Sequence, residues 1–253
     1  MAKQKSNQGT GTGINSNVTA VIPAYNEAPR LGAVLKVLKS YPYFREIIVI
    51  DDGSTDNTSE VAKKFGAHVI RNSENMGKGY SMDRGVKLAL ENGSDVIFFS
   101  DADITGFTPE MIQEIVEPVA QGDLDMFIGM TARRWYFVHK MLAFIPLLGG
   151  ERAVTVNLWK QVPDYYKQHF RIEVALNFFS VYYGKGYQYK ILPGVSQIIK
   201  EEKYGFWNGA LARIKMFYNL FSAQVKLNVY HRPRKWSSLF YGFRYKYKNG
   251  HKK

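Results

Sequence analysis

Two aspartates directly after an apolar run carry the strongest chemical signal in the chain. Asp101 and Asp103 follow Val96–Ser100, and because side chains alternate along extended backbone, both carboxylates are predicted to point the same way. Two carboxylates on one face repel each other unless a cation lies between them, and carboxylate oxygens suit Mg²⁺ or Mn²⁺, which also binds diphosphates. The pair is therefore a candidate metal site, with a solvated loop or a helix cap as the alternative.

Three more polar segments are placed where a ligand could bind. Pro23–Glu27 and Asp51–Asp56 each follow an apolar run, and Asn75–Gly79 precedes an expected helix. In the last segment the glycines are expected to expose backbone amides, and Lys78 adds a positive charge, a combination that suits a phosphate. The spacing of a P-loop is absent from this segment, which excludes a Walker-type nucleotide triphosphatase.

The elements that must position these segments alternate along the chain. Apolar runs predict strands at 18–22, 46–50, 67–70, 96–100 and 124–130, and helical periodicity predicts helices at 27–38, 56–65, 79–90 and 109–119. Further helices are expected at about 133–145 and 171–183, with a strand at 187–192. This alternation predicts an α/β fold with a mostly parallel sheet and helices on both faces. The carboxyl ends of parallel strands meet at one edge, so the polar segments are expected to lie close together.

Charge divides the chain unevenly. Residues 1–202 hold 22 basic and 22 acidic residues, whereas residues 203–253 hold 12 basic residues and no acidic one. Apolar residues at helical spacing predict an amphipathic helix from Trp207 to Val225 within this basic, aromatic tail. Such a tail fits an anionic membrane surface or a nucleic acid, or serves only for solubility. We expect a disordered leader at 1–17, a catalytic domain at 18–202 divided near 130, and the tail at 203–253.

Composition excludes several other classes. The chain has no cysteine, so thiolate metal sites and disulfides are impossible. No apolar run approaches the roughly 20 residues that span a bilayer, and the start lacks the apolar stretch of a signal peptide. A cytoplasmic protein bound peripherally to a membrane is expected.

The order of the motifs resembles family 2 glycosyltransferases of the GT-A (Rossmann-like) fold. The resemblance rests on Ala24–Glu27, Asp51–Ser54, Asn75–Gly79 and Asp101–Asp103, and it covers residues 18 to about 130. It implies Mg²⁺ or Mn²⁺ at Asp101 and Asp103. It also implies a UDP- or GDP-sugar lying against Pro23, Ala24, Tyr25, Glu27, Asp52, Gly77, Lys78, Arg84, Asp101 and Ala102.

The second half is expected to supply the remaining catalytic groups. Gly149–Val154 looks like the stretch that closes over the sugar in this family, and many relatives carry an acid where Glu173 begins a helix. With Asp103, Glu173 is therefore a catalytic candidate and the first choice for a general base, and Glu151 is the second. A helix residue paired with Arg171 or Lys167 is the alternative for Glu173. Gln197 stands where relatives often carry a histidine, which argues against a third metal ligand from the protein.

Among these relatives, the polyprenyl- and dolichyl-phosphate sugar synthases best fit the basic tail. They imply transfer with inversion to a lipid phosphate, for which the candidate ligands are Arg133, Arg134, Lys140 and Arg152. A soluble hydroxyl acceptor and a nucleotidyltransferase remain alternatives among enzymes. A nucleic-acid-binding module is the non-enzyme alternative, but it would leave the aspartate pair unexplained, so no nucleic acid partner is expected. His139, His169 and His231 are expected to be surface or core residues.

Overall fold

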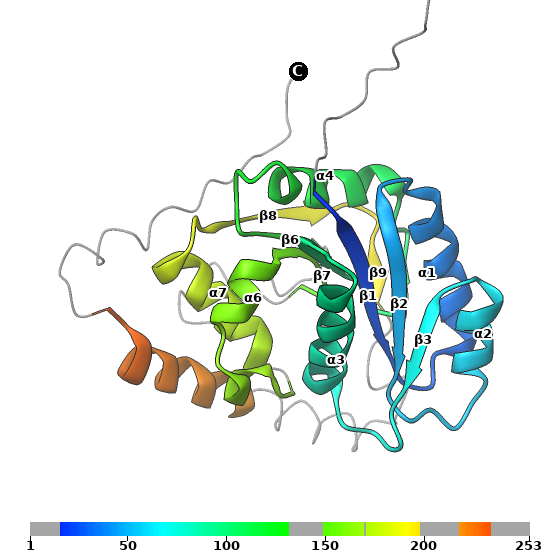
Figure 1. The fold of residues 1–253 in the computed structure, drawn as a ribbon, viewed down its shortest axis with the longest axis horizontal. Helices are drawn as coiled ribbons and strands as arrows, with labels where there is room; N and C mark the ends of the chain where they lie inside the picture. Colours follow the sequence, from blue (N-terminus) through cyan, green and yellow to red (C-terminus); the bar gives the residue numbers. More distant parts are fainter. Residues whose placement is uncertain (1–15, 132–148, 170, 198–217, 234–253) are drawn as a thin grey trace, which may run out of the picture.

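The structure is a computed structural model that describes residues 16–131, 149–169, 171–197 and 218–233 (Figure 1). Its strands are β1 (Val18–Ala24), β2 (Phe44–Asp51), β3 (His68–Arg71), β4 (Val96–Phe99), β5 (Ile104–Thr105), β6 (Met126–Thr131), β7 (Glu151–Thr155), β8 (Tyr187–Leu192) and β9 (Ser196–Gln197). Its helices are α1 (Ala28–Ser40), α2 (Thr58–Lys64), α3 (Lys78–Glu91), α4 (Pro109–Ala120), α6 (Val156–Gln161), η1 (Asp164–Lys167), α7 (Arg171–Tyr183) and η2 (Leu227–His231). Residues 218–226 are helical and continue into η2; we call 218–231 the tail helix.

A seven-stranded sheet in the order β3-β2-β1-β4-β7-β6-β8 forms the centre of the described residues. All its strands are parallel except β7, which runs antiparallel to β4 and β6. The mostly parallel sheet is therefore confirmed. The prediction did not include β7, because charged residues begin this short strand and hide its apolar residues, Ala153 and Val154.

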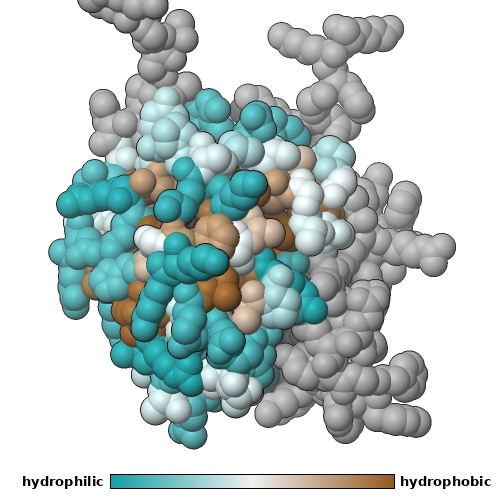
Figure 2. All heavy atoms as spheres, turned by 90° about the vertical axis from the view of Figure 1, so that its right-hand side faces the viewer, coloured by the Kyte–Doolittle hydropathy of each residue, from teal (hydrophilic) through white to brown (hydrophobic). Residues whose placement is uncertain are grey.

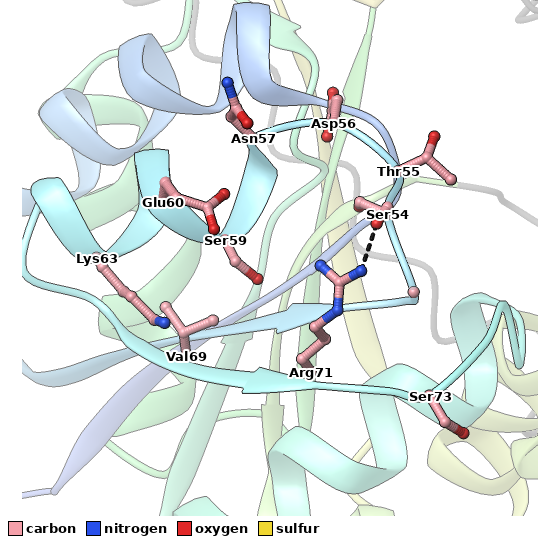
Figure 3. A pocket seen from close by; sticks show the side chains of 11 residues that line it. Ser54, Thr55, Asp56, Asn57, Ser59, Glu60, Lys63, Val69, Arg71 and Ser73 are labelled. Carbon is pink, nitrogen blue, oxygen red and sulfur yellow. Dashed lines mark hydrogen bonds between the residues drawn. The ribbon is translucent and has the colours of Figure 1, made fainter.

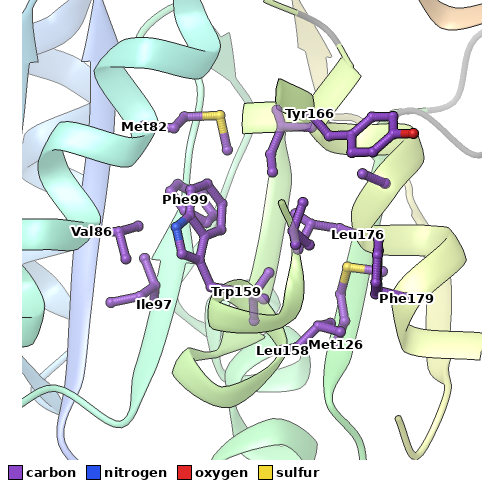
Figure 4. Close-up of a cluster of buried hydrophobic side chains, with 14 of the residues drawn as sticks. Met82, Val86, Ile97, Phe99, Met126, Leu158, Trp159, Tyr166, Leu176 and Phe179 are labelled. Carbon is purple, nitrogen blue, oxygen red and sulfur yellow. The ribbon is translucent and has the colours of Figure 1, made fainter. Parts of the chain in front are cut away.

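Helices cover both faces of the sheet, as predicted (Figure 1). One buried cluster joins β1, β2 and β4 to α1 and α4, and the other joins the sheet to α3, α6 and α7. Strand alternation divides β1 between them, because Val21 belongs to the second cluster while Ala20 and Ile22 belong to the first. In the second cluster the Trp159 ring packs on Phe99 with 5.2 Å between ring centroids (Figure 4).

The tail helix packs on the α/β domain through small and medium side chains. Leu220, Ala223 and Leu227 are buried in the second cluster, and the Tyr183 hydroxyl donates a hydrogen bond to the His231 carbonyl. The neighbouring stripe carries Tyr218, Phe221, Val225 and Val229, whose side chains are exposed. The described part of the predicted apolar stripe, Tyr218–Val225, thus faces away from the domain.

The exposed stripe contrasts with the face formed by α1 and α2, on which hydrophilic side chains predominate (Figure 2). Within the described ranges, no helix is long and apolar enough to cross a membrane.

Candidate functional site

The polar segments after β1, β2 and β4 lie at one edge of the sheet, as expected. Ala24 at the end of β1 is in register with Asp51 at the end of β2, and the Asp52 amide donates to the Ala24 carbonyl at 2.8 Å. Asp101 follows β4, which pairs with β1 on its other side. Parallel pairing thus brings residues some 80 positions apart to a common edge.

The first two segments are joined by their own polar groups. The Asn26 amide donates to the Ser54 hydroxyl at 2.9 Å, and the Thr55 amide donates to Asn26 Oδ1 at 2.8 Å. Asn26 has a φ of 55°, a left-handed conformation that asparagine tolerates better than most residues. These bonds fix the backbone of the segment that contains the predicted nucleotide ligands Pro23, Ala24 and Tyr25.

Glu27 is buried and lies at the start of α1. Its amide donates to the Thr58 hydroxyl at 2.9 Å, and its carboxylate pairs with Arg30 at 3.2 Å. The structure therefore shows Glu27 linking α1 to the start of α2, in addition to any contact with a nucleotide.

Asp51 is fully buried and holds the turn that follows it. Its carboxylate accepts hydrogen bonds from the Ser54 amide at 2.8 Å, from the Ser59 hydroxyl, and from Arg71 at 2.8 Å. Burial alone would raise the pKa of Asp51, but these hydrogen bonds and the Arg71 charge outweigh burial and lower it. Arg71 also donates to the Ser54 carbonyl beside a pocket on the outer side of the turn (Figure 3).

Asp52 fixes the segment that contains Lys78. Its Oδ1 accepts from the Met76 amide at 2.9 Å, and its Oδ2 accepts from the Gly77 amide at 2.8 Å. In this structure Asp52 uses the Gly77 amide, and a role of Gly77 in binding the nucleotide sugar stays a prediction. The buried Asp52 carboxylate sets the conformation of the loop that leads into α3.

A second layer supports Asp52. Asn72, which directly follows β3, donates to Asp52 Oδ1 at 2.7 Å, and Arg84 donates to Asn72 Oδ1 and to the Arg71 carbonyl. Arg84 was predicted near the diphosphate, but the structure turns its guanidinium towards the end of β3. Asn72 was not among the predicted site residues, although it carries the signal used for the other segments, a polar residue immediately after a strand.

Glycines at the start of α3 allow a close approach of the chain before α7. A Cβ atom on Gly79 would lie 2.7 Å from backbone atoms of Lys167 and His169, and one on Gly77 would lie 3.3 Å from the His169 ring. A side chain at either glycine position would push the chain at Lys167–His169 away from α3. His169 is exposed, as expected, and adopts a φ of 55° at this contact.

Lys78 lies between two carboxylates. Its Nζ is 2.9 Å from Asp101 Oδ1 and 3.2 Å from Glu173 Oε1. Burial alone would lower the pKa of Lys78, but the charges of Asp101 and Glu173 raise it well above its usual value. The lysine thus remains an ammonium ion and links the end of β4 to the first turn of α7.

Arg152 is the other cation beside Glu173. Only 1% of its side chain is exposed, and its guanidinium donates to the Gly149 carbonyl at 2.7 and 3.0 Å. It lies 3.5 Å from Glu173 Oε2. Arg152 was predicted to bind an acceptor phosphate, but in this structure it is enclosed within the protein and neutralises Glu173. The alternative partners of Glu173 contact other groups instead. Arg171 donates to Gln168, and Lys167 lies near the carboxylates of Asp83 and Asp164.

Glu151 is buried beneath Asp101. A Cβ atom on Gly150 would lie 1.9 Å from Asp101 Oδ2, so only glycine at this position admits the aspartate. Burial and the Asp101 carboxylate raise the pKa of Glu151 to about 8, although the Lys78 ammonium opposes the shift. Its Oε2 has no hydrogen-bond partner among the described residues. Residues 149–154, predicted to close over a sugar, thus include the buried start of a central strand.

The second aspartate of the pair precedes a two-stranded sheet. Asp103 is followed by β5, in which Ile104 pairs with Gln197 of β9. Position 197 is thus brought beside the aspartate loop. Within the described ranges, no cluster of three or more histidine, cysteine, aspartate or glutamate side chains could hold a metal ion. Arg133, Arg134, Lys140 and His139 lie outside the described residues.

Residues 19–141 match the family described as glycosyl transferase family 2. An uncharacterized protein of Methanocaldococcus jannaschii is 41% identical over 112 residues, which cover 44% of this chain and 45% of that protein. The UDP-N-acetylglucosamine--dolichyl-phosphate N-acetylglucosaminyltransferase of Methanococcus voltae is 29% identical over 43% of this chain and 49% of its own length. The chain spans about half the length of these curated relatives.

A solved structure shares the fold. Glucosyl-3-phosphoglycerate synthase from Mycobacterium tuberculosis, solved with Mn²⁺, UDP-glucose and phosphoglyceric acid, superposes with a TM-score of 0.68 and 22% identity. The match covers 85% of this chain and 81% of the other. The predicted GT-A fold is therefore confirmed.

Proposed function

We propose that this chain, whose residues 19–141 match glycosyl transferase family 2, transfers a sugar from a nucleoside-diphosphate sugar to a lipid phosphate at a membrane surface. The observation that carries the proposal is the convergence of Lys78, Asp101 and Glu173 at the carboxyl edge of the sheet. A positive charge beside paired carboxylates suits a diphosphate accompanied by a divalent cation.

The donor would lie across the ends of β1, β2 and β4. Tyr25 and Glu27 follow β1, and Asp52 fixes the loop that presents Lys78. In this arrangement the Lys78 ammonium would attract the diphosphate, and the carboxylates of Asp101 and Asp103 would hold the cation. Solved glucosyl-3-phosphoglycerate synthase structures contain Mn²⁺ or Mg²⁺ together with UDP, which supports a cation of this kind here.

The donor atoms of the site fit such a cation. Asp101 and Asp103 supply hard carboxylate oxygens, which Mg²⁺ and Mn²⁺ prefer. Because no cluster of three or more histidine, cysteine, aspartate or glutamate side chains that could hold a metal is found among the described residues, oxygens of the diphosphate would supply further ligands. When bound, the ion offsets the charge that develops on the leaving diphosphate.

Glu173 is the better candidate for a base. It lies close to Lys78 and Arg152, at the edge of the sheet that carries the site. Burial and the Asp101 carboxylate raise the pKa of Glu151 to about 8, so at neutral pH its carboxyl is mostly protonated. With a hydroxyl acceptor, Glu173 would take the proton as the acceptor attacks C1 from the face opposite the diphosphate, which inverts C1. A phosphate acceptor already carries negative charge, so no proton needs to be removed.

The tail supports an acceptor within a membrane. The exposed stripe Tyr218–Val229 lies on the side of the tail helix away from the domain, and the basic segment 203–253 would attract anionic lipids. The M. voltae relative is named for transfer to dolichyl phosphate. An alternative, transfer to a soluble hydroxyl acceptor, is favoured by the position of the Glu173 carboxyl beside Lys78, where it could serve as a base.

A transfer assay tests the proposal. The chain would be incubated with labelled UDP- and GDP-sugars, Mn²⁺ and a polyprenyl phosphate in anionic vesicles, and the lipid product extracted and measured. We expect a labelled lipid phosphate from the wild type and none from Asp101→Asn or Asp103→Asn. Asp95→Asn, at the opposite end of β4, is the matched control and should retain transfer. Labelling of only a soluble acceptor would overturn the lipid acceptor, and no transfer from any donor would overturn the activity.

A further inference from the structure

One ammonium group neutralises carboxylates from both halves of the catalytic domain. Lys78 Nζ lies 2.9 Å from Asp101 Oδ1 and 3.2 Å from Glu173 Oε1. The side chains of Lys78 and Asp101 are 23% and 21% exposed, and that of Glu173 is 8% exposed. In such a poorly solvated place an unpaired carboxylate is costly, so these charges stabilise one another.

The same ammonium group pairs with Asp101, the carboxylate that the donor's cation would need. A divalent ion at Asp101 would stand within a few ångströms of Lys78 Nζ, and two cations so close repel strongly where little water screens them. The diphosphate removes this conflict because its oxygens offer Lys78 a new anionic partner. This step rests on the proposed function, in which a diphosphate binds beside Lys78.

We propose that Lys78 is the resting counter-ion of the site, which excludes a divalent cation from Asp101 until a nucleoside diphosphate draws the ammonium away. Cation and nucleotide then bind cooperatively, and each raises the affinity of the other by the same factor. The exchange also removes Lys78 from Glu173, which keeps Arg152 at 3.5 Å from its Oε2. Donor binding thereby leaves Glu173 with Arg152 as its neighbouring cation and without its contact to Lys78.

Titration calorimetry with Mn²⁺ alone tests the exclusion. Replacing Lys78 by methionine removes the ammonium and keeps an unbranched side chain. A hydrogen bond to a charged group is worth about a factor of ten or more, so Lys78→Met should bind Mn²⁺ at least about tenfold more tightly than the wild type without nucleotide. Lys87→Met, which removes an exposed lysine of the same helix paired with Asp83, should leave Mn²⁺ affinity unchanged.

Cooperativity provides the second measurement. In the wild type, UDP or GDP should raise the affinity for Mn²⁺ strongly, and in Lys78→Met this gain should shrink by about tenfold. Equal Mn²⁺ affinity of Lys78→Met and the wild type, or an undiminished gain from nucleotide, would overturn the proposal.

A charge-matched double variant shows whether the effect of Lys78→Met comes from damage to the fold. Lys78→Met leaves two carboxylates without their ammonium, whereas Lys78→Met with Glu173→Gln removes one charge of each sign. The double variant should also bind Mn²⁺ more tightly than the wild type. A wild type that binds nucleoside diphosphate with Mn²⁺, combined with variants that gain no affinity for Mn²⁺ alone, defeats this inference but leaves the proposed function standing. A wild type that binds no nucleoside diphosphate with any cation defeats both.

Discussion

Lys78, the first residue of α3, and Glu173, in the first turn of α7, form an ion pair of 3.2 Å across 95 positions of sequence. The pair joins the half that would bind the donor to the half that would bind the acceptor. Because Asp101 shares the same ammonium, a change at any of these side chains alters the electrostatic environment of the other two. Substitutions here should therefore affect both substrates.

Replacing Glu173 by glutamine should distinguish the acceptor types. If a hydroxyl must lose its proton, removal of a positioned base should lower kcat by about 10²–10⁴-fold. If the acceptor is a lipid phosphate, the decrease should be much smaller, because no proton has to be removed. Initial rates with a polyprenyl phosphate and with phosphoglyceric acid would be compared. A rate near that of the wild type with every acceptor that is used would remove Glu173 as a required base.

Replacing Asp52 by alanine should weaken both the fold and donor binding. The buried carboxylate accepts from the Met76 and Gly77 amides, and a buried donor left without a partner costs about 1–3 kcal/mol. Urea unfolding should show a decrease of this size, and calorimetry should show weaker binding of UDP or GDP. Asp123→Ala, at an exposed carboxylate, is the control. An unchanged nucleotide affinity in Asp52→Ala would show that the 75–79 loop does not contribute to the donor site.

Local pattern was sufficient to predict most of the elements, though not β5, β7, β9 or α6, and the edge of the sheet that carries the site. The helix at 171–183 and the strand at 187–192 were predicted with the bounds observed, because apolar periodicity and adjacent glycines mark their ends. The segments after β1, β2 and β4 were identified because polar residues directly follow buried strands. These features depend only on residues that are close together in the sequence, so one sequence is enough to predict them.

The contacts between distant residues were not predictable in the same way. A polar residue after a strand can face a ligand or a nearby backbone amide, and packing decides between them, as it does for Asp52. The tail offers two stripes at helical spacing, and its sequence pattern did not decide which of them packs on the domain. The space beside α7 admits Leu220 and Ala223. Lys78 and Glu173 meet only because Gly79 lets the chain before α7 approach α3.

The raised pKa of Glu151 should make stability depend on pH. Its pKa is about 8 in the folded protein against an ordinary 4.5, so between these values the folded state binds more protons than the unfolded state. The free energy of unfolding should then fall as pH rises through this window, by on the order of a few kcal/mol. Glu151→Gln keeps the uncharged shape and should lose this decrease. Urea unfolding at pH 5, 6, 7 and 8 would compare the two proteins, and parallel curves would contradict the assignment.

The exposed stripe of the tail helix should bind anionic bilayers together with the basic segment that follows it. Phe221 is 71% exposed and Val229 is 67% exposed, so serine at both positions should fold normally while removing the side chains that would enter the headgroup region. Vesicle co-sedimentation should show weaker binding for this double variant. Tyr43→Ser, which removes an exposed aromatic ring that is 38% exposed and precedes β2, should bind like the wild type.

Salt separates the apolar and electrostatic contributions to this binding. Each cation near an anionic surface contributes about 1 kcal/mol and is screened within a Debye length. Binding of the wild type should therefore weaken as salt rises but persist, because insertion of the apolar stripe does not depend on charge. In the Phe221→Ser, Val229→Ser variant the remaining binding should disappear at high salt. A chain ending after Pro233 lacks seven of the basic residues and should bind with little dependence on salt. If the full chain fails to bind anionic vesicles even at low salt, a soluble acceptor becomes the better explanation of the site.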